Sequence, residues 1–140
     1  MLIVCAHCLA TNRVPAERTK DDPDCGKCGR PLLDGRPVAL DDARFESVTG
    51  TTELPVVVDF WAAWCGPCRM MAPQFEQAAQ RFKGRALFAK VDSDANPRTS
   101  GRFAIRSLPT LVLLRDGREI RRQPGALQAM QIVAWIGPDA

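Results

Sequence analysis

Hydrophobic residues in this chain fall into short runs that polar turns separate, and the clearest patterns lie after residue 37. An apolar run from Val56 to Trp61 opens after Pro55. A run that is apolar on both faces predicts a central strand that is covered on both sides. The next segment carries apolar residues at helical spacing, namely Met71, Phe75, Ala78 and Phe82. We therefore expect a strand that is followed by a helix with one buried face.

Weaker patterns continue this alternation along the chain. They predict strands and helices in the order β-α-β-α-β-α-β-β-α, with the weaker strands at residues 38–40, 85–91, 110–114 and 119–122 and two helices at 97–103 and 126–136. Asp41 or Asp42 is expected to cap the first helix, and Gly50 to end it. Asn96 caps the third helix, and Asp116-Gly117 forms a hairpin turn. The order predicts an α/β fold whose parallel strands are closed by an antiparallel hairpin.

Charge and hydropathy argue against two kinds of partner. The 19 basic and 16 acidic residues are scattered along the chain and give a net charge of +3. Because no basic block occurs, the charge pattern gives no support for nucleic-acid binding. No apolar run approaches the roughly 18 residues that cross a bilayer, and no signal peptide opens the sequence. We therefore expect a cytoplasmic protein that does not bind membranes.

Four cysteines form a distinct pattern near the start of the chain. Cys5 and Cys8 are separated by two residues, as are Cys25 and Cys28. This spacing matches a four-cysteine zinc site, in which two tight turns aim four sulfurs at one ion. The segment between the pairs is polar, so metal binding would supply the folding energy of this module. We expect a zinc-binding module at residues 1–30, a linker at 31–37 and a second domain at 38–140.

Other interpretations of these cysteines stay open. They could form a second redox pair or a disulfide instead of a metal site. His7 could act as a ligand, although it occupies a spacer position within the first turn. Four thiolates fill a tetrahedral shell, so we expect one zinc ion with a structural role.

A third pair, Cys65 and Cys68, lies where the predicted strand gives way to the predicted helix. Unpaired amides and the helix dipole favour negative charge at a helix N-terminus and lower the pKa of the first thiol. We expect Cys65 to be an exposed nucleophile, with Cys68 one turn further on and close enough to form a disulfide. The arrangement is typical of a redox motif. A structural disulfide and half of a zinc site are the alternatives.

Asp59 interrupts the apolar run six residues before Cys65. A carboxylate in a central strand costs free energy unless it is paired or protonated. Asp59 either accepts a proton during thiol chemistry or serves as a structural carboxylate bonded to backbone or water. Its position leaves both interpretations open.

Together these features resemble the thioredoxin family, over about residues 38–140. The resemblance rests on the segment from Trp61 to Cys68, on Asp59, and on the segment from Ile105 to Thr110. With the cysteine-rich leader, the chain is similar to the zinc-binding bacterial members of the thioredoxin 2 type. The resemblance implies a thioredoxin fold, a central five-strand mixed sheet flanked by four helices, beside a zinc-ribbon-like module. It also implies a protein-disulfide reductase that acts by thiol–disulfide exchange.

The resemblance implies roles for single residues. Cys65 would be the nucleophile, Cys68 the resolving thiol, Asp59 the buried acid/base and Lys90 its charged neighbour. Pro109 would be a cis-proline that faces the disulfide. The residues expected at the substrate are Trp61, Trp64, Gly66, Pro67, Leu108, Pro109 and Gly125, with core packing as the alternative for Trp61. The zinc ligands would be Cys5, Cys8, Cys25 and Cys28.

The expected partners are protein disulfide substrates and an NADPH-dependent flavoprotein thioredoxin reductase, which the resemblance implies. The sequence carries no dinucleotide fingerprint, so we expect neither NADPH nor flavin to bind this chain, which is expected to be a monomer. Two other functions compete with this one. The thioredoxin domain could be a scaffold in a zinc-ribbon adaptor, or the zinc thiolates could sense oxidants.

Overall fold

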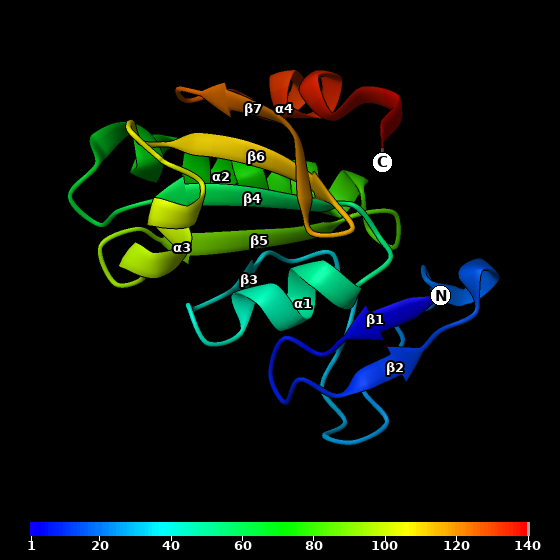
Figure 1. The fold of residues 1–140 in the computed structure, drawn as a ribbon. Helices are drawn as coiled ribbons and strands as arrows, with labels where there is room; N and C mark the ends of the chain where they lie inside the picture. Colours follow the sequence, from blue (N-terminus) through cyan, green and yellow to red (C-terminus); the bar gives the residue numbers. More distant parts are fainter. Residues whose placement is uncertain (140) are drawn as a thin grey trace.

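The computed structural model describes residues 1–139, and a five-stranded sheet forms its centre (Figure 1). Its strands lie in the order β3-β5-β4-β6-β7. The parallel part consists of β3 (Val38–Ala39), β5 (Leu87–Asp92) and β4 (Val56–Trp61). The antiparallel part consists of β6 (Thr110–Arg115) and β7 (Arg118–Pro124). The sheet is therefore mixed, as predicted, and the closing hairpin forms one edge.

Four helices cover the two faces of this sheet. One face packs against α1 (Phe45–Thr51) and the end of α3 (Pro97–Arg102). The other face packs against α2 (Gly66–Arg81) and α4 (Ala129–Ile136) (Figure 1). A short 3-10 turn, η2 (Gly137–Asp139), follows α4. The predicted order of nine elements after residue 37 is confirmed.

The position of β4 explains why its sequence is apolar without a break. Side chains alternate along a strand, so Val56, Val58 and Phe60 join the core beneath α1. Val57 joins the second core, beneath α2 and α4. Both faces of β4 are buried, and Asp59, two residues after Val57, points toward the α2 side.

Of the residues predicted to cap helices, Asp42 and Asn96 have other hydrogen-bond partners in the structure, whereas Asp41 lies at the start of α1. Asp41 accepts a hydrogen bond from the Arg44 amide (2.9 Å), in the turn that leads into α1. Asp42 caps α3 instead, because Oδ1 accepts from the Thr99 amide (2.8 Å). Asn96 does not cap α3, and its Oδ1 accepts from the Asp42 amide (3.0 Å). Sequence spacing cannot reveal such an exchange, because the partners lie more than 50 residues apart.

Several predicted boundaries were also wrong by a few residues. Gly50 does not end α1, which continues to Thr51. The strand expected at 85–91 starts at Leu87, and the helix expected at 126–136 starts at Ala129. Helix and strand ends depend on tertiary hydrogen bonds that periodicity does not report.

The N-terminal module is a small hairpin of β1 (Leu2–Val4) and β2 (Thr11–Arg13), followed by the 3-10 turn η1 (Ala16–Arg18). It is bonded to the segment that follows α1. The Val4 amide donates to Thr52 Oγ1 (3.1 Å), and the Leu2 amide donates to Glu53 Oε1. The Glu53 amide returns a bond to the Leu2 carbonyl (2.9 Å). Two bonds from backbone amides to side chains and one backbone–backbone bond thus hold the module beside α1 (Figure 1).

The module and the sheet share one hydrophobic core. Ile3, Val4 and Val14 are buried in the same cluster as Val48 and Leu54. The segment predicted as a linker contributes to this cluster too, through its buried residues Leu32 and Leu33. The domain boundaries themselves stay a prediction, but these contacts make the module part of the core. Val14, in the polar segment between the cysteine pairs, is therefore buried in a core that the neighbouring domain largely supplies.

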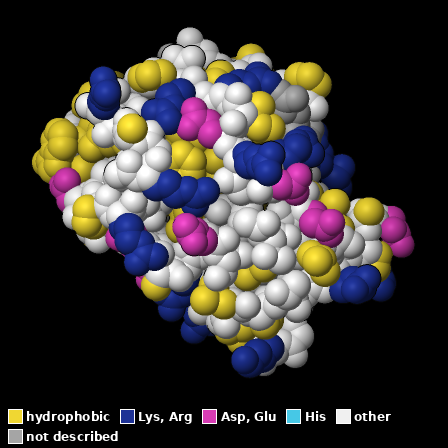
Figure 2. Space-filling model, in the orientation of Figure 1, with side chains coloured by type: hydrophobic (Ala, Val, Ile, Leu, Met, Phe, Trp, Pro, Cys, Tyr) yellow, Lys and Arg dark blue, Asp and Glu magenta, His cyan; other side chains and the backbone are white. Residues whose placement is uncertain are grey.

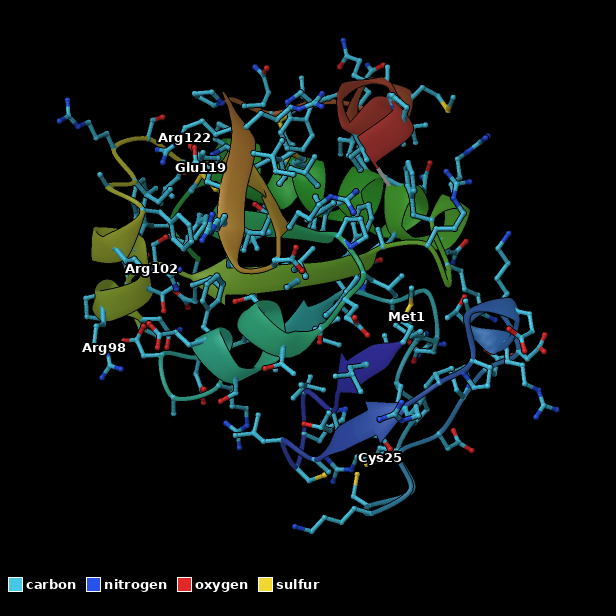
Figure 3. The ribbon with its side chains drawn as sticks, turned by 45° about the vertical axis from the view of Figure 1, so that its right-hand side comes forward. Met1, Cys25, Arg98, Arg102, Glu119 and Arg122 are labelled. Carbon is cyan, nitrogen blue, oxygen red and sulfur yellow. A yellow bond between two sulfur atoms is a disulfide. The ribbon has the colours of Figure 1, made fainter. Side chains whose placement is uncertain are left out.

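The hairpin of β6 and β7 turns where the sequence predicts. Asp116 and Gly117 both have positive φ, 53° and 76°, as a two-residue hairpin turn requires. Arg122 of β7 forms an ion pair with Glu119 (2.7 Å) and donates to the Phe103 carbonyl (2.7 Å), so it ties the hairpin to the end of α3 (Figure 3). Basic and acidic side chains are interspersed on the face that Figure 2 shows.

Candidate functional site

A disulfide between Cys65 and Cys68 lies at the N-terminus of α2. Cys65 is the N-cap residue, with extended backbone angles, and Pro67 lies in the first turn. The Cys65 sulfur accepts a hydrogen bond from the Cys68 amide (3.1 Å), one of the free amides at the helix start. The turn of the helix brings the two Cα atoms to 5.2 Å. The predicted strand–turn–helix placement of this pair is confirmed.

The exposure of Cys65 differs from the expectation. In this disulfide form Cys65 is 3% exposed and Cys68 is 2% exposed. Ala62 is buried with them, and Trp61 and Leu108 pack against this cluster. These neighbours cover the sulfurs, so the nucleophile is not freely exposed in this state.

Three loops meet beside the disulfide. The Leu108–Pro109 peptide bond is cis, as the resemblance implied. The Pro109 carbonyl accepts a hydrogen bond from the Gly125 amide (2.9 Å), which brings the segment after β7 to the same place. Gly125 has a φ of +93°, a conformation that side chains disfavour, and a Cβ there would meet no neighbour. The surface beside Pro109 is therefore open at Gly125.

A groove of about 400 Å³ lies between Trp64 and the segment that ends at Leu108, the residue before Pro109. Trp64, which is 68% exposed, and Leu108 lie in its wall. The Trp64 indole donates to Asp94 Oδ2 (2.8 Å), so the exposed ring is held in one orientation. Arg106 supplies a cation to the same wall. The groove is large enough for a few side chains of a docked polypeptide.

Asp59 is fully buried, and neither carboxylate oxygen has a hydrogen-bond partner within the described residues. Burial raises its pKa to about 7, and the nearby charge of Lys90 lowers it in part. Lys90 is the register partner of Asp59 on β5, and its ammonium lies 4.9 Å from the centre of the Trp61 ring. The structure thus brings Asp59, Lys90 and Trp61 together on the α2 side. A carboxyl group with this pKa changes protonation near neutral pH.

The four N-terminal cysteines form a second cluster. Their sulfur atoms all lie within 4.8 Å of one another. The sulfurs of Cys5 and Cys28 are 3.7 Å apart, and those of Cys8 and Cys25 are 3.6 Å apart. None of the four forms a disulfide. Figure 3 shows Cys25 beside β2, on the side away from the five-stranded sheet.

The donor set fits a zinc ion. Hydrogen bonds from the Cys28 amide, the Asn12 side chain and the Lys27 amide lower the pKa of Cys25 to about 6. The Arg30 amide lowers the pKa of Cys28, but partial desolvation of this exposed residue and the neighbouring sulfurs outweigh it and raise the pKa to about 11. Thiols so close together cannot all ionise without a cation, and four thiolates in a tetrahedron are a structural zinc site. His7 is outside the cluster, with Nδ1 3.1 Å from Arg30.

Sequence reasoning missed two residues of these sites. Asp94 bonds Trp64 across 30 residues, and Asn12 bonds Cys25 across 13 residues. No motif marks either residue, because both contacts depend on how separate loops fold back.

The predicted substrate residues come from three segments that meet near the disulfide. Trp64, Gly66 and Pro67 border the disulfide at the start of α2, and Leu108, Pro109 and Gly125 come from the two loops described above. No helix within residues 1–139 is both long and apolar enough to span a membrane.

Comparisons with known proteins agree with this geometry. The thioredoxin family model matches residues 36–137, and the model for the N-terminal region of thioredoxin 2 matches residues 4–30. Thioredoxin C-3 of Corynebacterium nephridii is 46% identical over 136 residues, which cover 97% of this chain and 93% of that protein. A thioredoxin of Haemophilus influenzae is 41% identical over 97 residues, 69% of this chain and 91% of the relative.

Among solved structures, a chloroplastic thioredoxin z has a TM-score of 0.66 at 32% identity, and the match covers 73% of this chain and 92% of that one. The cysteine pair at the start of α2, the mixed sheet and the family matches lead to one conclusion. The chain belongs to the thioredoxin family of thiol–disulfide oxidoreductases and carries an N-terminal zinc ribbon of the thioredoxin 2 type.

Proposed function

We propose that the protein is a protein-disulfide reductase that uses the Cys65–Cys68 dithiol and holds one structural zinc ion in its N-terminal module. The observation that carries the proposal is the bond between two cysteines at the N-terminus of α2. Two cysteines held within one turn of a helix can lose and regain their disulfide during a reaction cycle.

The reaction is thiol–disulfide exchange in two steps. In the reduced protein, the Cys65 thiolate attacks one sulfur of a substrate disulfide, and the other substrate sulfur leaves as a thiolate. The Cys68 thiolate then attacks the Cys65 sulfur of this mixed disulfide and releases the second substrate thiolate. Two electrons pass from the dithiol to the substrate, and the protein is left with the Cys65–Cys68 disulfide. The amide that bonds the Cys65 sulfur favours its ionised form.

Asp59 is the proposed proton acceptor for Cys68. It faces α2, the helix that carries Cys68, and its pKa of about 7 suits both gain and loss of a proton near neutral pH. Lys90 is a positioning residue whose charge limits how far burial raises the Asp59 pKa. The structural interpretation of Asp59 is weakened because its oxygens have no partner among the described residues.

The substrate segment would lie extended across Pro109, as in strand addition, with backbone groups as its main partners. Gly66 and Pro67 leave little side-chain bulk at the sulfurs, and Gly125 keeps the opposite side open. Trp64 offers an exposed ring beside the groove. Trp61 contributes mainly by packing against the cysteine cluster and Lys90. Recognition through the backbone permits many different protein substrates.

In the N-terminal module, Cys5, Cys8, Cys25 and Cys28 would hold the zinc ion. When bound, the ion neutralises the four thiolates and stabilises the two turns that carry them. Because four protein ligands leave no open position, the role is structural. We expect no NADPH or flavin on this chain.

The family implies that an NADPH-dependent flavoprotein reductase regenerates the dithiol. Gly66-Pro67 between the cysteines resembles reducing members, which favours reduction over oxidation as the direction. A cytoplasmic monomer remains our expectation for the location and state.

The test measures reduction of insulin disulfides with dithiothreitol as electron source. The wild-type protein should accelerate insulin precipitation, and Cys65→Ser should abolish the acceleration. Arg115→Lys, at an exposed position on the far end of β6, is the matched control and should retain activity. Activity of Cys65→Ser close to wild type would overturn the proposal.

A further inference from the structure

Asn12 of β2 joins the two cysteine turns through three hydrogen bonds. Its Nδ2 group lies 3.2 Å from the Ala10 carbonyl, just after the first turn. The same nitrogen lies 3.5 Å from the Cys25 sulfur, in the second turn. Its Oδ1 atom accepts from the Gly26 amide at 2.9 Å. One short, half-buried side chain therefore contacts both halves of the sulfur cluster.

We propose that Asn12 is a positioning residue for the metal centre, which holds the Cys25 sulfur in place by donating a hydrogen bond to it. The proposal rests on the zinc site proposed above. It adds a residue that is not a ligand and that no cysteine spacing reveals.

The chemistry of the bond explains why an asparagine suits this place. A thiolate accepts hydrogen bonds, so an amide N–H stabilises its charge and fixes the direction of its lone pairs. The Asn12 amide also offers an acceptor on its other side, and the Gly26 amide uses it. A side chain with only acceptors or only donors could satisfy one of these two partners but not both.

The position of Asn12 on β2 links the metal centre to the rest of the molecule. Asn12 is paired with Ile3 of β1, a fully buried residue of the shared core. Strand β1 is in turn bonded to Thr52 and Glu53 after α1. The strand that carries Asn12 is therefore tied to the core through β1, and Cys25 lies beside this strand (Figure 3).

Two variants separate the parts of this role. Asn12→Asp keeps the shape and the acceptor for Gly26, but replaces the donor to Cys25 with an oxygen. Asn12→Ala removes all three bonds. Thr11→Ala changes the exposed neighbour on the same strand and is the matched control.

The first measurement is zinc content of the purified wild-type protein, followed by the rate of zinc release to a chromophoric chelator. Loss of an outer-shell partner typically costs about 10- to 100-fold in metal affinity, so both Asn12 variants should release zinc about 10- to 100-fold faster. Thr11→Ala should release it at the wild-type rate. In the cobalt-substituted protein, both Asn12 variants should shift the sulfur-to-cobalt charge-transfer band, which a remote packing effect would leave unchanged.

The outcomes are distinguishable. A wild-type protein without zinc overturns the proposed metal site, and the role of Asn12 with it. A zinc-loaded wild type whose Asn12 variants release zinc within twofold of its rate overturns the role of Asn12 alone. Fast release from Asn12→Ala together with wild-type behaviour of Asn12→Asp would assign the effect to Gly26 and overturn the bond to sulfur. If Asn12→Ala does not fold, the rate and the band of Asn12→Asp decide.

Discussion

Three cysteine pairs with the same two-residue spacing have two different fates in this protein. Cys65 and Cys68 are bonded to each other at the start of α2. The N-terminal pairs form no such bond, and each sulfur lies near a sulfur of the other pair. Spacing alone therefore does not separate a redox pair from a pair of metal ligands.

The backbone after the first cysteine makes the difference. Each N-terminal pair lies in a turn of its own, and in each turn the amide after the second cysteine bonds back to the first, as the Arg69 amide does to the Cys65 carbonyl (3.2 Å). The difference is that the N-terminal turns end with a residue of positive φ. Leu9 donates to the Cys5 carbonyl and Gly29 to the Cys25 carbonyl, each at 2.9 Å. Leu9 and Gly29 both have positive φ, 65° and 79°, which ends the turn. After Cys65 the chain continues as a helix instead, and the two sulfurs of one pair face each other.

Substituting one cysteine in each kind of pair gives the largest expected effects on turnover and on zinc content. Cys68→Ser removes the resolving thiol, so turnover of insulin should fall about 1,000-fold or more, while a mixed disulfide with the substrate accumulates. Zinc content should stay at the wild-type level. Non-reducing electrophoresis and metal analysis check both results.

Cys8→Ser is the reciprocal variant, because Cys8 belongs to the zinc ligands. It should lose zinc and keep most of its turnover at low temperature. The contrast between the pairs breaks down if Cys8→Ser is as inactive as Cys68→Ser although it remains folded.

Removing the metal should produce the second largest effect. The N-terminal module shares its core with the sheet, so loss of zinc should lower the free energy of unfolding of the whole chain. Zinc contributes roughly 10–16 kcal/mol to folding in isolated fingers. We expect a smaller loss here, of at least about 4 kcal/mol, because the module also has the shared core to hold it. Urea unfolding with and without a strong chelator, followed by tryptophan fluorescence, measures the change.

Fluorescence reports on this coupling because Trp61 and Trp64 lie at the other cysteine pair. A control in the presence of excess zinc should restore the original midpoint. An unchanged midpoint after metal removal would mean that the two regions are energetically independent.

The redox pair also differs in having a buried acid on its side of the sheet. The pKa of Asp59 is raised from 3.8 to about 7, mainly by burial. Between these values the folded protein holds a proton that the unfolded chain releases, so the contribution of this group to stability falls as pH rises from about 4 to 7. Asp59→Asn removes this penalty. It should stabilise the protein by about 2–4 kcal/mol at pH 8 and by almost nothing at pH 4.

Denaturant midpoints at the two pH values check this prediction, and Asp92→Asn, on β5 and partly exposed, serves as control. The same Asp59 variant should reduce insulin more slowly, most clearly between about pH 7 and 8, where Asp59 is ionised and the Cys68 thiol still needs a proton acceptor. Equal stabilisation at pH 4 and pH 8 would show that Asp59 is ionised throughout or not buried as described.

The periodicity of apolar residues predicted strands and helices correctly where a single element buries one regular face or run of apolar side chains. The run at Val56–Trp61 and the stripe on α2 predicted a covered strand and its following helix, and both are present. The cysteine spacing predicted a four-sulfur cluster, and the sulfurs do meet. Each of these predictions uses a pattern of residues close together in the sequence. The alternation of a strand, the repeat of a helix and the spacing of metal ligands can all be read from such a pattern.

Contacts between distant segments were beyond the reach of the sequence. Burial of Leu32 and Leu33 in a segment that looks like a linker depends on the module folding back onto the sheet. The capping of α3 by Asp42, the low exposure of Cys65 and the bonds of Asn12 have the same origin. Local propensity describes each segment, whereas these features depend on which segments become neighbours.

The smallest expected effect concerns the two equivalent turns of the zinc module. Leu9 adopts the left-handed conformation that costs residues other than glycine about 1–2 kcal/mol, and Gly29 occupies the matching place at no such cost. Leu9 is 37% exposed, so its side chain adds little to the core. Leu9→Gly should therefore stabilise the zinc-loaded protein by about 0.5–1 kcal/mol, and Gly29→Ala should destabilise it by about 1 kcal/mol. A Cβ at Gly29 meets no neighbour, so the second change measures backbone strain alone. Opposite shifts in the urea midpoint would establish that both turns obey one geometry, and a loss of stability in Leu9→Gly would mean that the leucine side chain outweighs its strained backbone.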